Sequence, residues 1–252
     1  MSDRPVLGID IGGSGIKGAP VDLATGEFAD ERLRIDTPSK STPQNVAEVV
    51  QTVADHFKAG HGSAPIGITV PGIVRHGTVQ SAANIDKSWL GTDADALFSE
   101  AIGRPVHVMN DADAAGLAEV KYGAAKDQRG LVIVATLGTG IGAAIIYDGV
   151  LVPNAELGHL EIDGYDAESR AAESARDREG LSWGEWAKRL TRYFGVVEFL
   201  FSPDLFVVGG GVSKKFHKFG GDIKIKTPIV PAKLLNTAGI VGAAWQANAL
   251  ER

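Results

Sequence analysis

The chain has 252 residues, of which 44% are hydrophobic and 22% are charged, and its 31 acidic and 25 basic side chains give a net charge of −6. This composition excludes a mainly disordered chain, and the negative balance argues against nucleic-acid binding through a global positive field. The chain has no cysteine, which excludes disulfides, thiolate zinc sites and cysteine nucleophiles. Its length suits one large domain or two compact ones. The N-terminal residues lack the apolar run of a signal peptide, so we expect a cytoplasmic location.

A glycine-rich stretch follows the first apolar run of the chain. Residues 6–9 predict a strand, and the glycines at 12–18 predict a tight turn that leads into a second strand. Glycine permits positive φ and close approach, so successive N–H groups can converge on an anion. Ser14 adds a hydroxyl donor and Lys17 adds a positive charge. The turn is therefore a candidate phosphate site, with an ordinary β-hairpin as the alternative.

Helices and strands alternate through the next hundred residues, and this alternation predicts an α/β fold. Pro71-Gly72 ends one predicted strand, and Asn84 is a polar candidate in a later turn. The predicted helices are 43–59, 93–102 and 112–122, and the predicted strands are 65–70 and 105–109.

Asn110 and Asp111 stand where a predicted strand ends and a predicted helix begins. Ligands of open α/β sheets bind at the carboxyl ends of the strands, so this position favours a functional role. Asp111 could accept the proton of a substrate hydroxyl while the hydroxyl oxygen attacks phosphorus. The alternative is that Asp111 only caps the helix, and the local sequence favours neither interpretation.

Residues 130–147 carry no charge, and their length alone would allow a membrane span. Glycines and threonines interrupt the centre of this stretch, so two strands around a glycine turn fit better. Residues 138–144 match residues 13–19 at most positions, which predicts an internal repeat. Both turns also fit G-x-G-x-x-G/A, but helix is disfavoured after each, so a dinucleotide-binding motif is rejected. Two such turns facing each other would hold a phosphate chain from both sides.

The segment 154–161 brings Glu156, His159 and Glu161 into a short loop-like stretch. Carboxylates accept hydrogen bonds from sugar hydroxyls, and an imidazole can donate or accept, so the segment suits a polyhydroxylated ligand. A metal site and a solvated loop are the alternatives, although no second histidine lies nearby at a metal-ligand spacing.

The last part of the chain predicts a helix at 183–201, a strand at 205–208 that runs into a glycine triplet, and a final helix at 238–249. Six lysines between residues 214 and 233 are accompanied by a single aspartate, although the chain as a whole is acidic. Such a run is usually a solvated surface, but its position directly after the glycine triplet is equally consistent with a path for a polyanion.

We expect two domains from this organisation. The first would span residues 1–110 and the second residues 111–237, and the segment 238–252 would rejoin the first domain.

Taken together, these motifs resemble the ROK family of sugar kinases, which belongs to the actin, Hsp70 and hexokinase superfamily. More narrowly, the chain resembles the bacterial polyphosphate glucokinases, including the polyphosphate/ATP glucomannokinase type. The resemblance implies a two-domain, actin-like α/β fold of the hexokinase and ribonuclease H-like type, with mixed sheets. The matching segments are 6–17 and 137–142 for the two phosphate motifs, 110–119 for the catalytic segment, 156–159 for the sugar-binding segment and 208–213 for the adenosine-side turn.

The resemblance assigns a role to each candidate residue. Asp111 would be the general base, Asp10 would orient magnesium through water, and Pro71 and Gly72 would shape the sugar pocket. The sugar would be held by Asn84, Asn110, Asp111, Glu156, His159 and Glu168, with Glu161 as an alternative to Glu168. The phosphates or nucleotide would be bound by Asp10, Gly12, Gly13, Ser14, Gly15, Lys17, Thr136, Gly138, Thr139, Gly140, Gly210, Gly211, Lys214 and Lys215.

The implied reaction moves a phosphoryl group from polyphosphate, and often also from ATP, to the 6-hydroxyl of glucose or mannose. The resemblance also implies Mg²⁺ as cofactor and a homodimer, with neither nucleic acid nor membrane as partner. Many ROK kinases carry a cysteine-rich zinc motif after the sugar-binding histidine; this chain has no cysteine, so no structural zinc is expected.

Three alternatives remain. A strictly ATP-dependent glucokinase belongs to the same class. A sugar-sensing transcription repressor would need an N-terminal helix-turn-helix, for which the first strand, beginning near Val6, leaves no room. A non-enzymatic protein of the actin type would bind or hydrolyse ATP without needing sugar.

Overall fold

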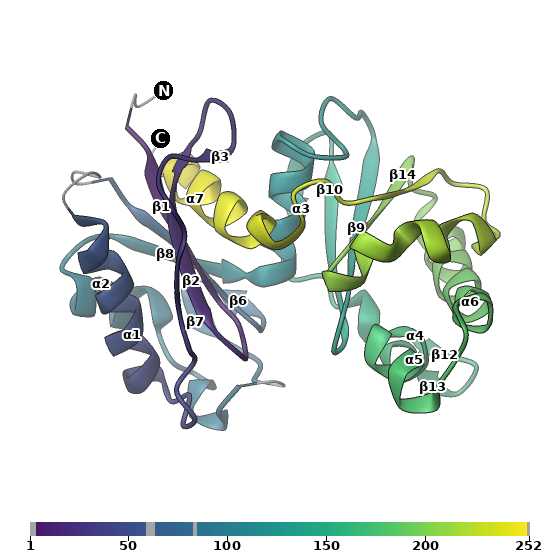
Figure 1. The fold of residues 1–252 in the computed structure, drawn as a ribbon, viewed down its shortest axis with the longest axis horizontal. Helices are drawn as coiled ribbons and strands as arrows, with labels where there is room; N and C mark the ends of the chain where they lie inside the picture. The colour runs from purple at the N-terminus through teal and green to yellow at the C-terminus, as the bar shows by residue number, and fades with distance from the viewer. Residues whose placement is uncertain (1–3, 59–63, 83–84, 251–252) are drawn as a thin grey trace. The chain divides into compact units, whose positions relative to one another are not determined.

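The computed structural model describes residues 4–58, 64–82 and 85–250, which fold into two compact units (Figure 1). Unit 1 comprises Met1–Ala118 and Thr237–Arg252, and unit 2 comprises Glu119–Asn236. Helix α3 (Asp111–Lys121) begins in unit 1 and ends in unit 2. Both units combine a mixed sheet with helices, so the predicted α/β class is confirmed.

The sheet of unit 1 contains an antiparallel hairpin joined to parallel strands. Its order is β3-β2-β1-β5-β8, with β4 paired to β2. The carboxyl ends of the parallel strands β1, β5 and β8 meet at one edge of the sheet, where the candidate residues of this unit follow. The strands are β1 (Val6–Ile11), β2 (Ile16–Asp22), β3 (Glu27–Phe28), β4 (Leu33–Ile35), β5 (Ile66–Val70) and β8 (Val106–Asn110), and β6 (Val74–Arg75) pairs separately with β7 (Thr78–Val79).

Besides the start of α3, the described residues of unit 1 form the helices α1 (Pro43–His56), α2 (Ala94–Ile102) and α7 (Ala238–Leu250) and the 3-10 turn η2 (Lys87–Trp89). The Thr42 side chain caps α1 by accepting the Asn45 amide, as expected for a threonine at this position. The C-terminal helix α7 packs on β1 and β5. Glycine is required at this contact, because a Cβ at Gly67 would clash with the backbone of Ala243.

Unit 2 repeats the same sheet pattern in the order β11-β10-β9-β14-β15. Strands β9 and β10 form an antiparallel hairpin, and β9, β14 and β15 are parallel. The predicted repeat is therefore a glycine-turn hairpin at the same place in each sheet. The strands are β9 (Leu131–Leu137), β10 (Ile141–Tyr147), β11 (Val150–Val152), β14 (Leu205–Gly209) and β15 (Ile229–Pro231), with a separate pair β12 (Glu161–Ile162) and β13 (Tyr165–Asp166).

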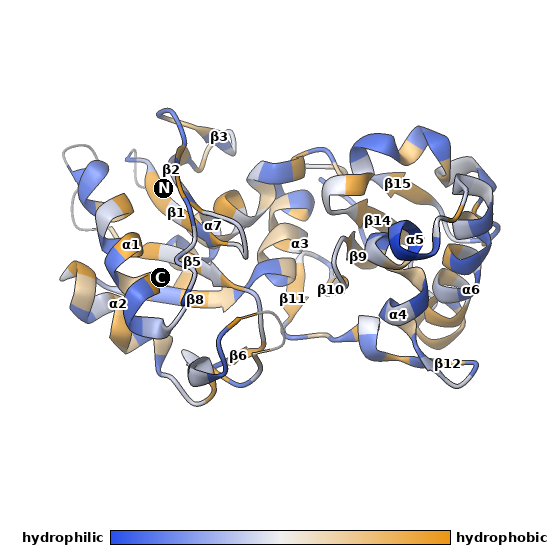
Figure 2. Ribbon diagram, turned by 60° about the horizontal axis from the view of Figure 1, so that its bottom comes forward, coloured by the Kyte–Doolittle hydropathy of each residue, from blue (hydrophilic) through white to orange (hydrophobic). Residues whose placement is uncertain are grey.

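The helices of unit 2 cover an aromatic core formed by Trp186, Phe194, Phe206 and Phe219. Figure 2 shows hydrophobic residues along the central strands of this unit and mostly hydrophilic residues in two short helices, α4 and α5. The longest helix begins with a capping box between Ser182 and Glu185. These helices are α4 (Ala167–Ala171), α5 (Glu173–Glu179) and α6 (Trp183–Phe201), with 3-10 turns η3 (Leu157–His159), η4 (Gly211–Lys218), η5 (Gly220–Asp222) and η6 (Leu235–Thr237).

The uncharged stretch 130–147 forms the hairpin β9–β10, as the glycine pattern predicts. Within the described residues, none of the helices combines the length and the apolarity that crossing a membrane requires.

Candidate active site

The first glycine turn, residues 12–15, joins β1 to β2 in unit 1. The Gly12 N–H donates to the Gly15 carbonyl at 3.2 Å, whereas the N–H groups of Gly13 and Ser14 find no acceptor in the described part of the chain. At Gly13 a Cβ would meet no described atom within 4 Å, but at Gly15 it would lie 2.8 Å from Nε of Arg34. The turn is therefore closed on one side and open on the other, where two free donors are exposed to an anion.

Asp10 and Lys17 pair across this hairpin, with Lys17 Nζ 3.4 Å from Asp10 Oδ2. The other oxygen, Asp10 Oδ1, accepts the hydroxyl of Thr69 at 2.9 Å. Arg34 adds a second cation, because its guanidinium donates to the Ser14 carbonyl at 2.8 Å. Arg34 could not be predicted from the glycine motif, since only the pairing of β2 with β4 places it beside the turn.

A cavity of about 180 Å³ lies beside the first turn within unit 1. The Thr37 hydroxyl donates to the Gly12 carbonyl at 2.6 Å, which fixes the turn to the segment that follows β4. Apart from its hydroxyl side chains, nothing in the sequence pattern marks this segment as part of a site. Asn84 lies outside the described residues. The cavity is lined by Ile11, Gly12, Gly13, Thr37, Pro38, Ser39, Ser41, Val46, Val70, Pro71, Ile85 and Trp89.

Asn110 and Asp111 have separate roles at the end of β8. The buried Asn110 side chain accepts the Asp113 amide at 3.0 Å, which is the geometry of a helix N-cap, and donates to the Gly72 carbonyl at 3.0 Å. Asp111 is exposed, and its Oδ1 accepts the adjacent Ala112 amide at 2.9 Å. Asn110 therefore caps α3, and the Asp111 carboxylate lies at the surface on the carboxyl edge of the sheet.

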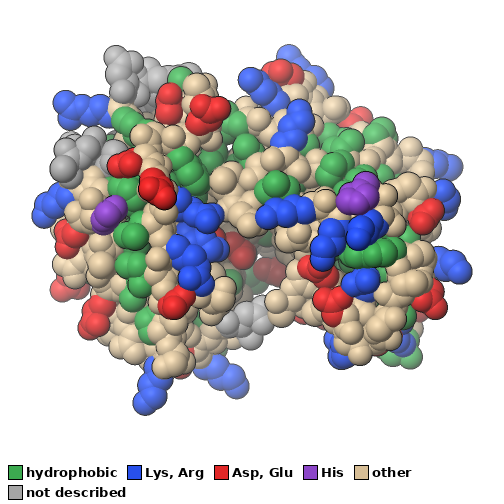
Figure 3. All heavy atoms as spheres, in the orientation of Figure 1, with side chains coloured by type: hydrophobic (Ala, Val, Ile, Leu, Met, Phe, Trp, Pro, Cys, Tyr) green, Lys and Arg blue, Asp and Glu red, His purple; other side chains and the backbone are tan. Residues whose placement is uncertain are grey.

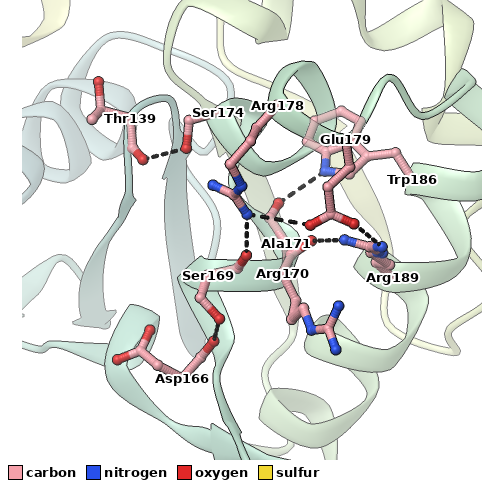
Figure 4. A network of polar contacts seen from close by, with 10 residues as sticks. All are labelled: Thr139, Asp166, Ser169, Arg170, Ala171, Ser174, Arg178, Glu179, Trp186 and Arg189. Atoms are coloured by element: carbon pink, nitrogen blue, oxygen red, sulfur yellow. Dashed lines mark hydrogen bonds and ion pairs between the residues drawn. The ribbon is translucent and has the colours of Figure 1, made fainter.

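The second glycine turn, residues 138–140, joins β9 to β10 in unit 2. Gly138 donates to the Gly140 carbonyl at 3.0 Å, and a Cβ at Gly138 would meet no described atom within 4 Å. At Gly140 a Cβ would clash with the Glu168 carboxylate. Figure 4 shows Ser174 beside this turn; its hydroxyl donates to the Thr139 carbonyl at 2.6 Å, and its amide donates to the Gly138 carbonyl at 3.0 Å.

The two turns are thus built alike. Gly13 and Gly138 face open space, while Gly15 and Gly140 are each closed by a charged side chain of their own unit. None of the five turn glycines at positions 12, 13, 15, 138 and 140 has φ in the left-handed region, so a positive φ is not the reason for glycine at these positions. Lack of room accounts for glycine at positions 15 and 140, whereas the space beside positions 13 and 138 is open.

A third glycine turn, Gly210-Gly211, follows β14 and lies next to the second turn. Gly210 has φ +80°, and a Cβ there would clash with the Leu137 backbone, so both conformation and space require glycine. Thr136 pairs in register with Gly209 on the neighbouring parallel strand. Thr136 and the glycine triplet therefore share one edge of the unit 2 sheet.

Glu168 and the turn η3, which carries His159, both contact Ile141, the residue that follows the second turn. The turn η3 packs on Ile141 so closely that a Cβ at Gly158 would clash with its carbonyl. Glu168 Oε2 accepts the Ile141 amide at 3.0 Å. The sugar-binding candidates and the second phosphate candidate are therefore one connected structure within unit 2.

Charges interact strongly in this segment. Burial raises the pKa of Glu156, and the neighbouring His159 partly offsets this effect. The hydrogen bond to Asp166 raises the pKa of His159, and Glu168, Asp166 and Glu156 raise it further. Ligand atoms of His159, Asp166 and Glu168 lie within 4.8 Å of one another, close enough to share a cation. His159 Nδ1 and Asp166 form a 2.9 Å hydrogen bond, so their proximity does not require a cation. Glu161, the alternative sugar contact, is exposed on β12.

Lys214 and Lys215 lie exposed on η4, directly after the third glycine turn. Figure 3 shows Lys and Arg side chains gathered over this part of unit 2. Arg176 lies 3.7 Å from the Trp183 ring, and Nζ of Lys215 lies 5.9 Å from it, so an aromatic side chain organises part of this cationic surface. The prediction from the lysine run did not include Arg176 or Trp183.

Comparisons with known proteins find similarity along nearly the whole chain. The model of the ROK family matches residues 6–176. The chain is 49% identical to the polyphosphate glucokinase of Mycobacterium tuberculosis (strain CDC 1551 / Oshkosh), over 96% of this chain and 91% of that protein. It is 27% identical to the glucokinase of Streptomyces coelicolor, over 94% of this chain and 96% of that protein. The crystal structure of the inorganic polyphosphate/ATP-glucomannokinase from Arthrobacter sp. strain KM superposes with a TM-score of 0.93 and 57% identity, over 99% of this chain and 100% of that one.

Proposed function

Because the chain belongs to the ROK family, we propose that it is a kinase that transfers a phosphoryl group from inorganic polyphosphate, and also from ATP, to the 6-hydroxyl of glucose. The observation that carries this proposal is the matched pair of glycine turns, each with an open face at Gly13 or Gly138. A long phosphate chain is the ligand that two such turns would bind together. The similarity along the whole chain to a polyphosphate glucokinase supports this donor.

In the proposed reaction both glycine turns bind the phosphates of the donor. The turn at Gly13 and Ser14, with Lys17 and Arg34, holds one part of the phosphate chain, and the turn at Thr139 holds another. The free N–H groups and the cations stabilise negative charge on the transferred group.

Asp111 is the proposed general base. Its carboxylate accepts the proton of the sugar 6-hydroxyl as that oxygen attacks the terminal phosphorus, and the bond to the bridging oxygen breaks. The donor leaves shortened by one phosphate. Asn110, Glu156, His159 and Glu168 hold the other hydroxyls of the sugar. Asn84, Pro71 and Gly72 are proposed to complete the sugar pocket, and Pro71 lines the unit 1 cavity.

Mg²⁺ fits the residues around Asp10. The carboxylate of Asp10 and the hydroxyl of Thr69 are hard oxygen groups at the first turn, and the Asp10 side chain is 21% exposed. Mg²⁺ keeps most of its own waters, so Asp10 would hold it through water. When bound, the cation would reduce the negative charge on the donor phosphates.

We also propose that the chain forms a homodimer through unit 2. Large apolar side chains are exposed at the end of α6, including Phe199 at 86% and Leu200 at 54%. Exposed apolar clusters of this kind mark association surfaces. A cytoplasmic location, and the lack of nucleic-acid and membrane partners, remain predictions. Analytical ultracentrifugation of wild type and Phe199→Ser would test the dimer, which predicts a lower mass for the variant.

A donor-by-sugar activity matrix tests the proposed function. Purified protein with Mg²⁺ is incubated with glucose or mannose and with polyphosphate or ATP, and hexose 6-phosphate is measured. The proposal predicts product from glucose with polyphosphate. Product with ATP alone would identify a strictly ATP-dependent glucokinase, and no product with either donor would overturn the kinase proposal in favour of a non-catalytic regulator.

A further inference from the structure

One carboxylate, that of Asp166, contacts two of the three proposed sugar-binding residues of unit 2: the side chain of His159 and the backbone amide of Glu168. Its Oδ2 accepts the Nδ1–H of His159 at 2.9 Å. Its Oδ1 accepts the backbone amide of Glu168 at 3.2 Å, which makes Asp166 the N-cap of α4. The Asp166 carbonyl also accepts the Ser169 hydroxyl at 2.6 Å, as Figure 4 shows. Asp166 is therefore held in place by the helix that it caps.

These contacts decide which atoms remain for a ligand. An ionised carboxylate only accepts hydrogen bonds, so Nδ1 of His159 must carry a proton and Nε2 is the ring nitrogen left for another partner. The cap fixes the first turn of α4, from which Glu168 reaches the Ile141 amide beside the second glycine turn. Movement of Asp166 would thus disturb the imidazole and the glutamate together.

We propose that Asp166 is a positioning residue of the sugar site, which orients His159 through Nδ1 so that Nε2 meets a hydroxyl of the hexose. This inference rests on the proposed function, because the hexose is the ligand that the function assigns to His159. Neither the motif analysis nor the roles implied by the family resemblance include Asp166. Its two contacts follow from the pairing of β12 with β13, which brings it back towards His159.

Three variants separate the orientation of His159 from the helix cap. Serine also caps helices but is too short to reach the imidazole, so Asp166→Ser keeps the cap and removes the partner of His159. Asp166→Ala removes both the helix cap and the hydrogen-bond partner of His159. Asp163→Asn is the matched control, because Asp163 lies in the same β12–β13 hairpin, pairs with Arg192, and has no hydrogen bond to His159.

Asp166→Ser should raise the glucose KM about tenfold, while kcat stays within about threefold of wild type and the donor KM is unchanged. The reason is that the contact between His159 and the sugar is weakened equally in the ground state and the transition state. The Tm should stay near that of wild type, whereas Asp166→Ala should lower it. Asp163→Asn should leave the glucose KM unchanged. A glucose KM within twofold of wild type in Asp166→Ser would overturn the proposal.

A second measurement is independent of turnover. NMR titration of the His159 ring should show a lower pKa in Asp166→Ser than in wild type, because the neighbouring Glu156 and Glu168 remain but the hydrogen-bonded carboxylate is gone. An unchanged His159 pKa would show that Asp166 does not control the imidazole. If the wild-type protein makes no hexose 6-phosphate, the proposed function fails while this titration still reports on Asp166.

Discussion

Substituting Gly138 with alanine tests the proposed phosphate role of the second glycine turn without disturbing the fold. A Cβ at Gly138 would meet no described atom within 4 Å, and Gly138 does not have φ in the left-handed region. The substitution should therefore stabilise the fold by about 0.4–1 kcal/mol, because alanine restricts the unfolded chain more than glycine does. The added methyl group would stand in the space through which we propose that phosphate reaches the N–H groups of Thr139 and Gly140.

The loss of activity follows from the hydrogen bonds that the methyl group blocks. A hydrogen bond from an amide to a charged phosphate contributes about 1.5–3 kcal/mol. Losing one such bond lowers kcat/KM for the donor about 10- to 150-fold, since each 1.36 kcal/mol is a factor of ten. The glucose KM should change little if the sugar-binding residues stay in place.

Steady-state kinetics with polyphosphate and with ATP, together with urea unfolding, measure these effects. Gly184→Ala is the control, because Gly184 lies in the first turn of α6 and a Cβ there also meets no described atom within 4 Å. Gly184→Ala should raise the free energy of unfolding and leave kcat/KM with both donors unchanged. If Gly138→Ala keeps wild-type kcat/KM with both donors, the second turn does not bind phosphate.

Three further predictions concern other parts of the molecule. Asp111→Asn should lower kcat at least about a hundredfold while glucose still binds, as measured by kinetics and calorimetry; near-wild-type turnover would remove Asp111 from its role. Neutralising Lys214 and Lys215 to glutamine should raise the KM for polyphosphate more than that for ATP, and equal effects would exclude a polyphosphate path over η4. The hydrogen bond from Arg189 lowers the pKa of Glu179 from its ordinary value of 4.5 to about 2. The pair therefore stabilises the fold fully at pH values above 4.5, and this contribution is lost as the pH falls to 2. Glu179→Gln should therefore be less stable than wild type at pH 7 in urea unfolding, with a difference that shrinks between pH 4.5 and pH 2; a constant difference would contradict the assignment.

The elements with a strong local signal could be predicted from the sequence. Apolar spacing located α1, α2, α3, α6 and α7 to within a few residues. The glycine turns between apolar runs predicted both hairpins. These signals are local, because each depends on neighbours within one element or one turn.

Residues that act through contacts distant in sequence could not be predicted. Arg34 reaches the first turn through strand pairing, and Ser174 reaches the second turn from a polar helix that has no apolar periodicity. Asp166 contacts His159 only because a short hairpin reverses the chain between them. At Asp111 the structure shows that the neighbouring Asn110 accepts the Asp113 amide as the N-cap of α3, and the role of Asp111 as general base stays a prediction.

A crystal structure with glucose and a non-hydrolysable triphosphate analogue tests the central claim most directly. The account predicts that amides of both turns, near Gly13 and near Thr139, contact the same phosphate chain, and that Asp111 lies within hydrogen-bond distance of the glucose 6-hydroxyl. A donor bound by one turn alone, or a 6-hydroxyl out of reach of Asp111, would contradict the account.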